Sequence, residues 1–144
     1  MRSFTYSEHI QRTPEQVFAF MMDFTQAPRW RSLVRRIDLV GEGPAHQGSQ
    51  MLITLDVMGK TRQVVSELWS YDPGRRLGFR NTASNVTAQF EYVLAAEGGG
   101  TRVTFTCDVR PRGFMWLLMP WISRSHRIRY SDQLSRLKAI VEAA

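Results

Sequence analysis

The sequence predicts an α+β domain in which a curved antiparallel sheet of about seven strands is covered by a long C-terminal helix. Between residues 34 and 109, short runs of alternating apolar and polar residues are separated by turn signals such as Asp72-Pro73-Gly74. This pattern is typical of strands joined in antiparallel hairpins. The end of the chain instead carries apolar residues at helical spacing. Because a sheet with one apolar face needs a second layer, we expect this helix to cross the concave face.

The N-terminal part is expected to form one strand followed by two short helices. Apolar and polar residues alternate over residues 4–10, which predicts the strand. Thr13-Pro14-Glu15-Gln16 then offers an N-cap threonine, a proline at the first helical position and a glutamine placed for a capping box. The first helix should end near Asp23, and a second should run through residues 27–30.

The middle of the chain is expected to form six further strands, over residues 34–40, 50–57, 61–71, 76–81, 86–95 and 102–109. Short connections such as Gly59-Lys60 imply that successive strands pair in an antiparallel meander. A strongly twisted sheet of this size curls rather than lying flat. One helix cannot fill the concave side of such a sheet, so we expect a cavity between them.

The C-terminal helix is predicted by a stripe of apolar side chains at steps of four, three and four residues: Tyr130, Leu134, Leu137 and Val141. The segment before it, residues 114–122, is apolar all round and is followed by several basic residues. Three interpretations of residues 114–129 stay open. The segment suits buried packing over the pocket, a ligand gate or contact with an anionic membrane, or a homodimer patch.

Composition indicates a single soluble domain over residues 1–144. Hydrophobic residues make up 43% and charged residues 22% of the chain, which is ordinary for a globular protein. The net charge of +6 raises the prior for an anionic partner, although the basic residues are spread along the chain. The N-terminus has no apolar core of signal-peptide type, and nine consecutive apolar residues fall far short of the roughly 20 that span a bilayer. We therefore expect a cytoplasmic protein.

Several short motifs, spread over nearly the whole chain, resemble those of the SRPBCC (START-like, helix-grip) superfamily. They are Ile10-x-x-x-Pro14-Glu15-x-Val17-Phe18, Asp23, Pro28-x-Trp30, Gly48, Asp72-Pro73-Gly74-Arg75-Arg76-Leu77, Tyr92-x-Leu94, Gly100-Thr101-x-Val103-Thr104 and Leu134-x-x-Leu137-Lys138-x-x-Val141-Glu142. The chain is most similar to the polyketide cyclase/dehydrase and lipid-transport-like branch. The resemblance implies a helix-grip fold with a pocket for a hydrophobic small molecule between the sheet and the C-terminal helix. It leaves open which molecule is bound and whether a reaction is catalysed.

Strand parity and this expected fold nominate the residues that would line the pocket. In each of the last two strands, every second residue lies on an apolar face. The series begins at Val86 in one strand and at Val103 in the other. Trp30 suits a pocket wall and equally suits ordinary core. The candidate ligand-binding residues are Trp30, Ile53, Leu55, Phe79, Phe90, Tyr92, Phe105, Trp116, Tyr130 and Leu134.

Two residues are candidates for an acid or a base in the pocket. Tyr92 places a hydroxyl on an apolar surface, where it needs a partner, and we favour a neighbouring side chain or water over a ligand. The parity of strand 61–71 is open: Glu67 is a buried carboxylate if Val65, Glu67 and Trp69 face inward, and a surface charge if Val64, Ser66 and Leu68 do. Cys107 has no evident base beside it and is expected to be a small buried hydrophobe.

No cofactor or metal is indicated. The three histidines and Cys107 lack metal-ligand spacing, and the glycines at 98–100 join two strands rather than opening a helix. Arg29-Trp30-Arg31 with Arg35-Arg36 interleaves basic and aromatic residues, but no common nucleic-acid recognition module accompanies it.

The leading hypothesis is therefore binding or transport of a lipid, quinone or polyketide-like molecule. The first alternative is a cyclase or dehydrase that uses the same pocket. The second is an interaction module acting through residues 114–129.

Overall fold

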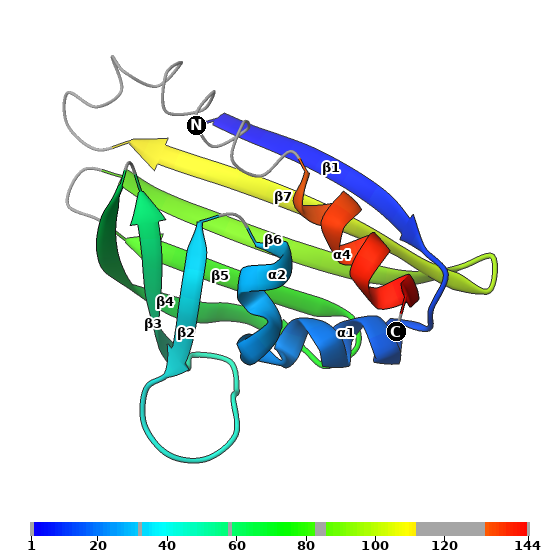
Figure 1. Cartoon of the computed structure of the whole chain (residues 1–144), viewed down its shortest axis with the longest axis horizontal. Coiled ribbons are helices and arrows are strands. Elements are labelled where there is room, and N and C mark those ends of the chain that lie inside the picture. Colours follow the sequence, from blue (N-terminus) through cyan, green and yellow to red (C-terminus); the bar gives the residue numbers. More distant parts are fainter. Residues whose placement is uncertain (1, 32, 58, 83–85, 112–131, 144) are drawn as a thin grey trace.

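The computed structural model describes residues 2–31, 33–57, 59–82, 86–111 and 132–143 (Figure 1). Its elements are, in chain order, β1 (Arg2–Ile10), α1 (Pro14–Met22), the 3₁₀ helix η1 (Phe24–Gln26), α2 (Ala27–Trp30), β2 (Val34–Leu39), β3 (Gln50–Val57), β4 (Lys60–Asp72), β5 (Arg76–Thr82), β6 (Val86–Glu97), β7 (Gly100–Pro111) and α4 (Gln133–Ala143). The predicted elements are confirmed. The last two strands are longer than predicted, because they continue pairing up to a two-residue turn at Gly98-Gly99.

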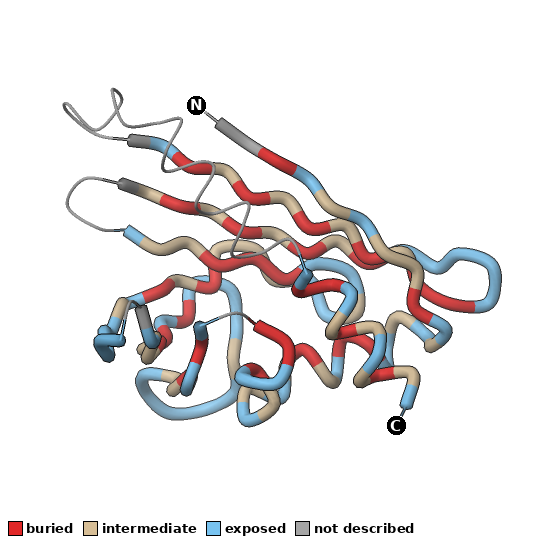
Figure 2. The backbone as a smooth tube through the Cα atoms, turned by 45° about the horizontal axis from the view of Figure 1, so that its top comes forward, coloured by how far each residue is buried: buried red, intermediate tan, exposed pale blue. Residues whose placement is uncertain are grey.

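The seven strands form one curved antiparallel sheet in the order β1-β7-β6-β5-β4-β3-β2. Strands β2 to β7 follow one another as the predicted meander, and β1 closes the far edge by pairing with β7. Figure 2 shows the sheet as one layer, with α1, α2 and α4 in the layer facing it. Helix α1 packs on β6 and β7, whereas α4 packs on β1 and α2.

The start of α1 has the predicted capping box. The Gln16 backbone N–H donates to the Thr13 side chain at 3.2 Å, and the Thr13 backbone N–H donates to Gln16 Oε1 at 3.1 Å. Pro14 occupies the first helical turn. These contacts satisfy amide groups that have no partner within the helix. The helix therefore begins at a defined residue, and it buries Val17, Phe18 and Met21.

The inward faces of the central strands are those that parity predicted. Figure 2 shows buried positions alternating with less buried ones along these strands. On β3 and β5 the buried apolar residues are Met51, Ile53, Leu77 and Phe79, and on β6 and β7 they are Ala88, Phe90, Tyr92, Leu94, Val103, Phe105, Cys107 and Val109.

The parity of β4 is now decided, and an inward Glu67 is wrong. Ser66 and Leu68 are fully buried, whereas Val65 is 56% exposed. Glu67 lies on the outer face, where its carboxylate pairs with the Arg80 guanidinium at 3.5 Å.

The outer face also provides a place for the large side chain of Trp69. Its indole N–H donates to the Phe90 carbonyl at 3.3 Å, and the indole lies over Gly78, which has no side chain to obstruct it. Glu67 and Trp69, the two residues that made the parity of β4 ambiguous, thus both lie on the outer face and have partners there.

Helix α4 buries the predicted stripe. Leu134, Leu137 and Val141 are at most 5% exposed, and Gln133 is buried on the same face. Tyr130, predicted as the start of the stripe, lies outside the described residues. Within the described ranges, no helix has the length and apolar character needed to cross a membrane.

The C-terminal end of α4 is tied to the end of β1 by a small polar cluster. Glu142 Oε2 accepts from Lys138 Nζ at 2.7 Å and from the Gln11 backbone N–H at 2.8 Å. Lys138 Nζ also donates to the His9 carbonyl at 2.6 Å. These contacts lower the pKa of the Glu142 carboxyl below its ordinary value of 4.5. The hydrogen bond from Lys138 has the largest effect, and the bond from the Gln11 backbone has the next largest.

We expect Glu142→Gln to lower the melting temperature at neutral pH. A carboxyl whose pKa is lower in the folded state stabilises that state above its unfolded-state pKa, and this contribution is lost as pH falls through the folded-state pKa. The difference between wild type and variant should therefore shrink below pH 4.5. Thermal melts from neutral pH to about pH 3 would measure it. Glu42→Gln, at an exposed loop position, is the matched control. A wild-type advantage that does not change with pH would contradict the prediction.

Candidate functional site

An aromatic surface covers the centre of the concave face. Phe90 stacks on Phe105 with ring centroids 6.2 Å apart and planes 9° apart, and Tyr92 lies 4.9 Å from Phe105. Phe4 on β1 extends the cluster, 6.4 Å from Phe105. Phe79 pairs directly with Phe90 across β5 and β6. Alternation along four adjacent strands, β1, β7, β6 and β5, thus gathers these rings on one face.

The Tyr92 hydroxyl has a partner on α4. It donates to Gln133 Oε1 at 2.7 Å, and both side chains are 1% exposed. The prediction favoured a neighbouring side chain or water as the partner of this hydroxyl, and Gln133 is such a side chain. A hydrogen bond buried at this depth ties the sheet to the terminal helix, because either group left alone would lose its water without compensation.

We expect Tyr92→Phe to lower the free energy of unfolding by about 1–3 kcal/mol, because Gln133 Oε1 would stay buried without this donor. Adding Gln133→Met should recover most of the loss, since replacing both polar partners with apolar groups is nearly neutral. Urea denaturation of Tyr92→Phe, of Gln133→Met and of the double variant gives the coupling free energy between the two side chains. Additive losses would show that the two groups do not act as a pair.

Helix α2 contributes two adjacent side chains to the same face. Trp30 is 1% exposed and meets Tyr92 edge to face at a centroid distance of 5.5 Å. Arg31, the residue after the helix, is 5% exposed, and its guanidinium carbon lies 4.7 Å from the centroid of the Phe79 ring. Of the two arginines in the Arg29-Trp30-Arg31 motif, Arg31 is therefore buried and Arg29 is exposed. Arg35 and Arg36 pair with Asp56 and Asp38 at 3.3 and 2.8 Å.

Several polar atoms on the concave side are buried without a hydrogen-bond partner. Within the described residues they include Trp30 Nε1, Arg31 Nε and Nη1, Gln133 Nε2 and Asn81 Oδ1. Asn81 follows Phe79 at the next inward position of β5 and pairs with the buried Ala88. Most buried polar groups in proteins are hydrogen-bonded, so such a group of exceptions needs an explanation.

The other predicted lining residues take the following places. Ile53 is 1% exposed on β3, and its neighbour on the same face, Leu55, is partly buried. Leu134 is 4% exposed on α4. Trp116 and Tyr130 lie outside the described residues, as does all of the 114–129 segment. Its predicted membrane and dimer contacts therefore stay predictions.

On the described parts of β5 to β7, the inward-facing ionisable side chains are Tyr92 and Cys107. Burial, with a smaller effect of the Asp108 charge, raises the pKa of the Cys107 thiol to about 12. The thiol is thus protonated at neutral pH and unreactive as a nucleophile. On β1, Glu8 has the inward parity and is partly buried. Within the described ranges, no three His, Cys, Asp or Glu side chains form a cluster that could hold a metal ion.

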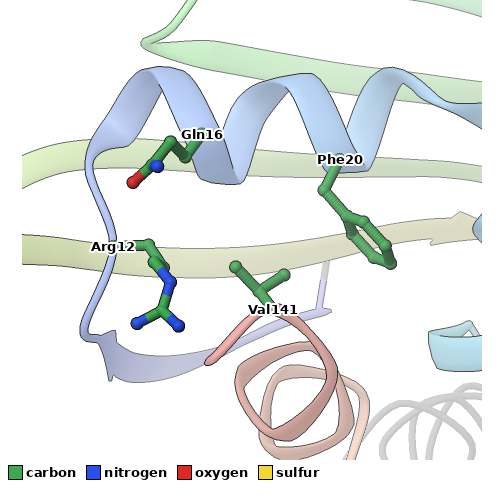
Figure 3. A pocket seen from close by; sticks show the side chains of 4 residues that line it. All are labelled: Arg12, Gln16, Phe20 and Val141. Atoms are coloured by element: carbon green, nitrogen blue, oxygen red, sulfur yellow. The ribbon is translucent and has the colours of Figure 1, made fainter. Parts of the chain in front are cut away.

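A separate pocket of about 280 Å³ lies between α1 and the end of α4 (Figure 3). Arg12, Gln16, Phe20 and Val141 line it. Its polar groups are already engaged in the fold, since Gln16 Oε1 serves the capping box and the Arg12 guanidinium donates to the carbonyls of Gln11 and Glu142. We interpret this pocket as a gap between packed helices and place the candidate site on the aromatic concave face.

The sequence over residues 1–142 matches the family model described as polyketide cyclase / dehydrase and lipid transport. The chain belongs to this family. The resemblance noted in the sequence motifs is thereby confirmed over nearly the whole chain. Membership in the polyketide cyclase/dehydrase and lipid-transport family supports hydrophobic-ligand binding or a cyclase role in general terms, without selecting between them. A comparison with curated proteins finds no match.

Solved structures share the fold of this family member at low sequence identity. The protein TTHA0849 from Thermus thermophilus is 20% identical, with a TM-score of 0.77 over 99% of this chain and 98% of that one. A START superfamily protein from Mycobacterium smegmatis is 11% identical, with a TM-score of 0.77 and coverage of 98% and 97%. The di-domain ARO/CYC BexL of the BE-7585A biosynthetic pathway is 18% identical, with a TM-score of 0.80; the match covers 99% of this chain but 47% of BexL. These similarities show the START-like helix-grip fold.

Sequence reasoning missed two residues of the candidate site. Gln133 precedes Leu137 by four residues and Val141 by eight, so helical spacing alone places it on the buried face. Arg31 gives no such signal. Its burial follows from the extended backbone at the end of α2, which turns the side chain towards Phe79.

Proposed function

We propose that this chain binds a hydrophobic small molecule, of the lipid, quinone or polyketide-like kind, between the sheet and α4. The observation that supports this most directly is the aromatic surface of Phe79, Phe90, Tyr92 and Phe105, bordered by buried polar atoms without partners. Small-molecule sites typically combine apolar and aromatic walls with a few polar groups that set orientation. Removing apolar ligand surface from water would contribute about 25 cal/mol per Å². Family membership supports the same class of role.

The alternative is a cyclase or dehydrase that acts in the same place, a role suggested by the family description and by the ARO/CYC structures. Such chemistry needs a group that can donate or accept a proton. Tyr92 and Glu8, which has the inward parity on β1, are the candidates for it, since Cys107 is held protonated and Glu67 lies on the outer face. We place a carrier or sensor first because the Tyr92 hydroxyl already donates to Gln133.

Native mass spectrometry of freshly purified protein, followed by extraction of bound material, tests the proposal. We expect a discrete added mass that is released on denaturation. Phe90→Trp should reduce its occupancy without unfolding the chain, whereas Val93→Trp, on the outer face of the same strand, should not reduce it.

Three outcomes separate the alternatives. No bound molecule, together with a loss of about 1–3 kcal/mol of stability in Phe90→Trp, would indicate a tightly packed core and contradict the proposal. Chemical conversion of the extracted molecule by the protein, abolished in Tyr92→Phe, would favour the cyclase. Binding without conversion would favour the carrier.

A further inference from the structure

We infer that the ligand of the concave face is an amphiphile whose polar end is a carboxylate, and that Arg31 is its principal contact. This inference rests on the proposed function and goes further by naming the chemical class of the ligand. Three side chains carry it: Arg31, Trp30 and Gln133, which we call the donor cluster. All three are at least 95% buried, and each has a hydrogen-bond donor atom without a partner in the described ranges.

Arg31 is the decisive member of the donor cluster because it carries a full charge. Its guanidinium lies over the Phe79 ring, and its Nε and Nη1 atoms have no acceptor among the residues that the structure describes. Of the ion pairs found among the described residues, none includes Arg31. Attraction to an aromatic face compensates a buried cation only in part. A buried charge without a counter-charge is costly, and a bound anion would remove that cost.

The other two donors face the same patch of the sheet. The edge-to-face contact places the Trp30 ring beside Tyr92. Gln133 Oε1 accepts from the Tyr92 hydroxyl, and Gln133 Nε2 has no partner within the described residues. Tyr92 lies two residues beyond Phe90, the direct partner of Phe79. Phe79 and Tyr92 are thus diagonal neighbours on one face, about 7–8 Å apart in backbone terms. The donor cluster therefore converges on one part of the aromatic surface.

Donors of this number and charge suit a carboxylate better than a single carbonyl or a hydroxyl. A carboxylate presents two oxygens with about four acceptor positions, carries the complementary charge and matches the planar fork of a guanidinium. Asn81 Oδ1, an unpartnered acceptor one inward position from Phe79, would suit a hydroxyl on the same molecule. The net charge of +6 favours the approach of an anion.

The test compares each of two acids with its own methyl ester by isothermal titration calorimetry on the full chain. The probes are dodecanoate and 1-pyrenebutyrate, so that both an alkyl and an aromatic tail are sampled. We expect wild type to bind at least one acid about tenfold to a hundredfold more tightly than its ester, the range for hydrogen bonds to a charged group. Arg31→Met should lose this preference and keep the affinity for the ester.

Arg29→Met is the matched control, because Arg29 is an exposed arginine on the same short helix. It removes the same charge from the outside of the molecule and should leave the preference for the acid unchanged. Arg31→Met should also melt at the same or a higher temperature than wild type without ligand, because it removes a buried charge that has no ion-pair partner among the described residues.

The outcomes separate the inference from the proposed function. Equal binding of acid and ester by wild type would overturn the inference and leave hydrophobic binding in place. A preference for the acid that survives in Arg31→Met, or is lost equally in Arg29→Met, would overturn the assignment to Arg31. Binding of none of the four probes, with no molecule co-purifying, would overturn the proposed function and the inference together. A lower melting temperature for Arg31→Met with the preference intact would assign Arg31 a structural role only.

Discussion

Replacing Phe105 with alanine is expected to lower the free energy of unfolding by about 3–5 kcal/mol. Phe105 is 1% exposed and lies at the centre of the aromatic surface, in contact with Phe4, Phe90 and Tyr92. These rings belong to three strands, so no single local shift can close the space that alanine would leave. The cost therefore includes both the lost burial and the cavity that remains.

Urea denaturation with fits of the midpoint and slope measures this effect. Thr104→Ala, at a partly buried outward-facing position of the same strand, is the control and should cost less than about 1 kcal/mol. A loss of similar size in both variants would mean that Phe105 is not packed in the core. If a ligand co-purifies, the measurement should be repeated after its removal, because bound ligand adds to the apparent stability.

Replacing Leu137 with alanine is expected to cost about 2–5 kcal/mol and to act first on α4. Leu137 is fully buried and lies between Leu134 and Val141 on the buried face of the helix. The described helix has only 11 residues, and an isolated helix of this length is marginal in water. Its order thus depends on packing against β1 and α2.

Amide hydrogen exchange distinguishes loss of this helix from loss of the whole fold. In Leu137→Ala, the amides of α4 should exchange faster while those of β6 and β7 keep most of their protection. Ser135→Ala, at an exposed position of the same helix, should leave both unchanged. Uniform acceleration across helix and sheet would show that α4 and the sheet unfold as one unit.

Short-range patterns determined most of the fold. Three features could be predicted because each depends on residues close together in the chain. They are the capping box at Thr13 and Gln16, the inward faces of β6 and β7, and the apolar stripe on α4. The family could be named from short motifs, since these mark the turns and helix starts that the fold requires.

The candidate site was harder to predict from the sequence, because its side chains come from different helices and strands and are brought into contact only by the tertiary fold. Tyr92 was nominated from strand alternation, but its partner Gln133 lies 41 residues away and was found only through the packing of α4 on the sheet. Glu67 could not be assigned a face, since both parities of β4 are mixed in composition. Its position follows from the burial of Ser66 and Leu68 on the other face of β4, while Arg80 and Gly78 on the neighbouring strand give Glu67 and Trp69 places on the outer face.

The sequence by itself therefore determined the class of the fold, the order of its elements and the apolar character of the concave face. Only the tertiary structure decided which polar groups reach that face, and above all that Arg31 is buried over Phe79 with no ion-pair partner in the described part of the chain. The physical reason is that periodicity reports burial along one element, whereas hydrogen bonds and charge pairs depend on distances between elements far apart in the chain.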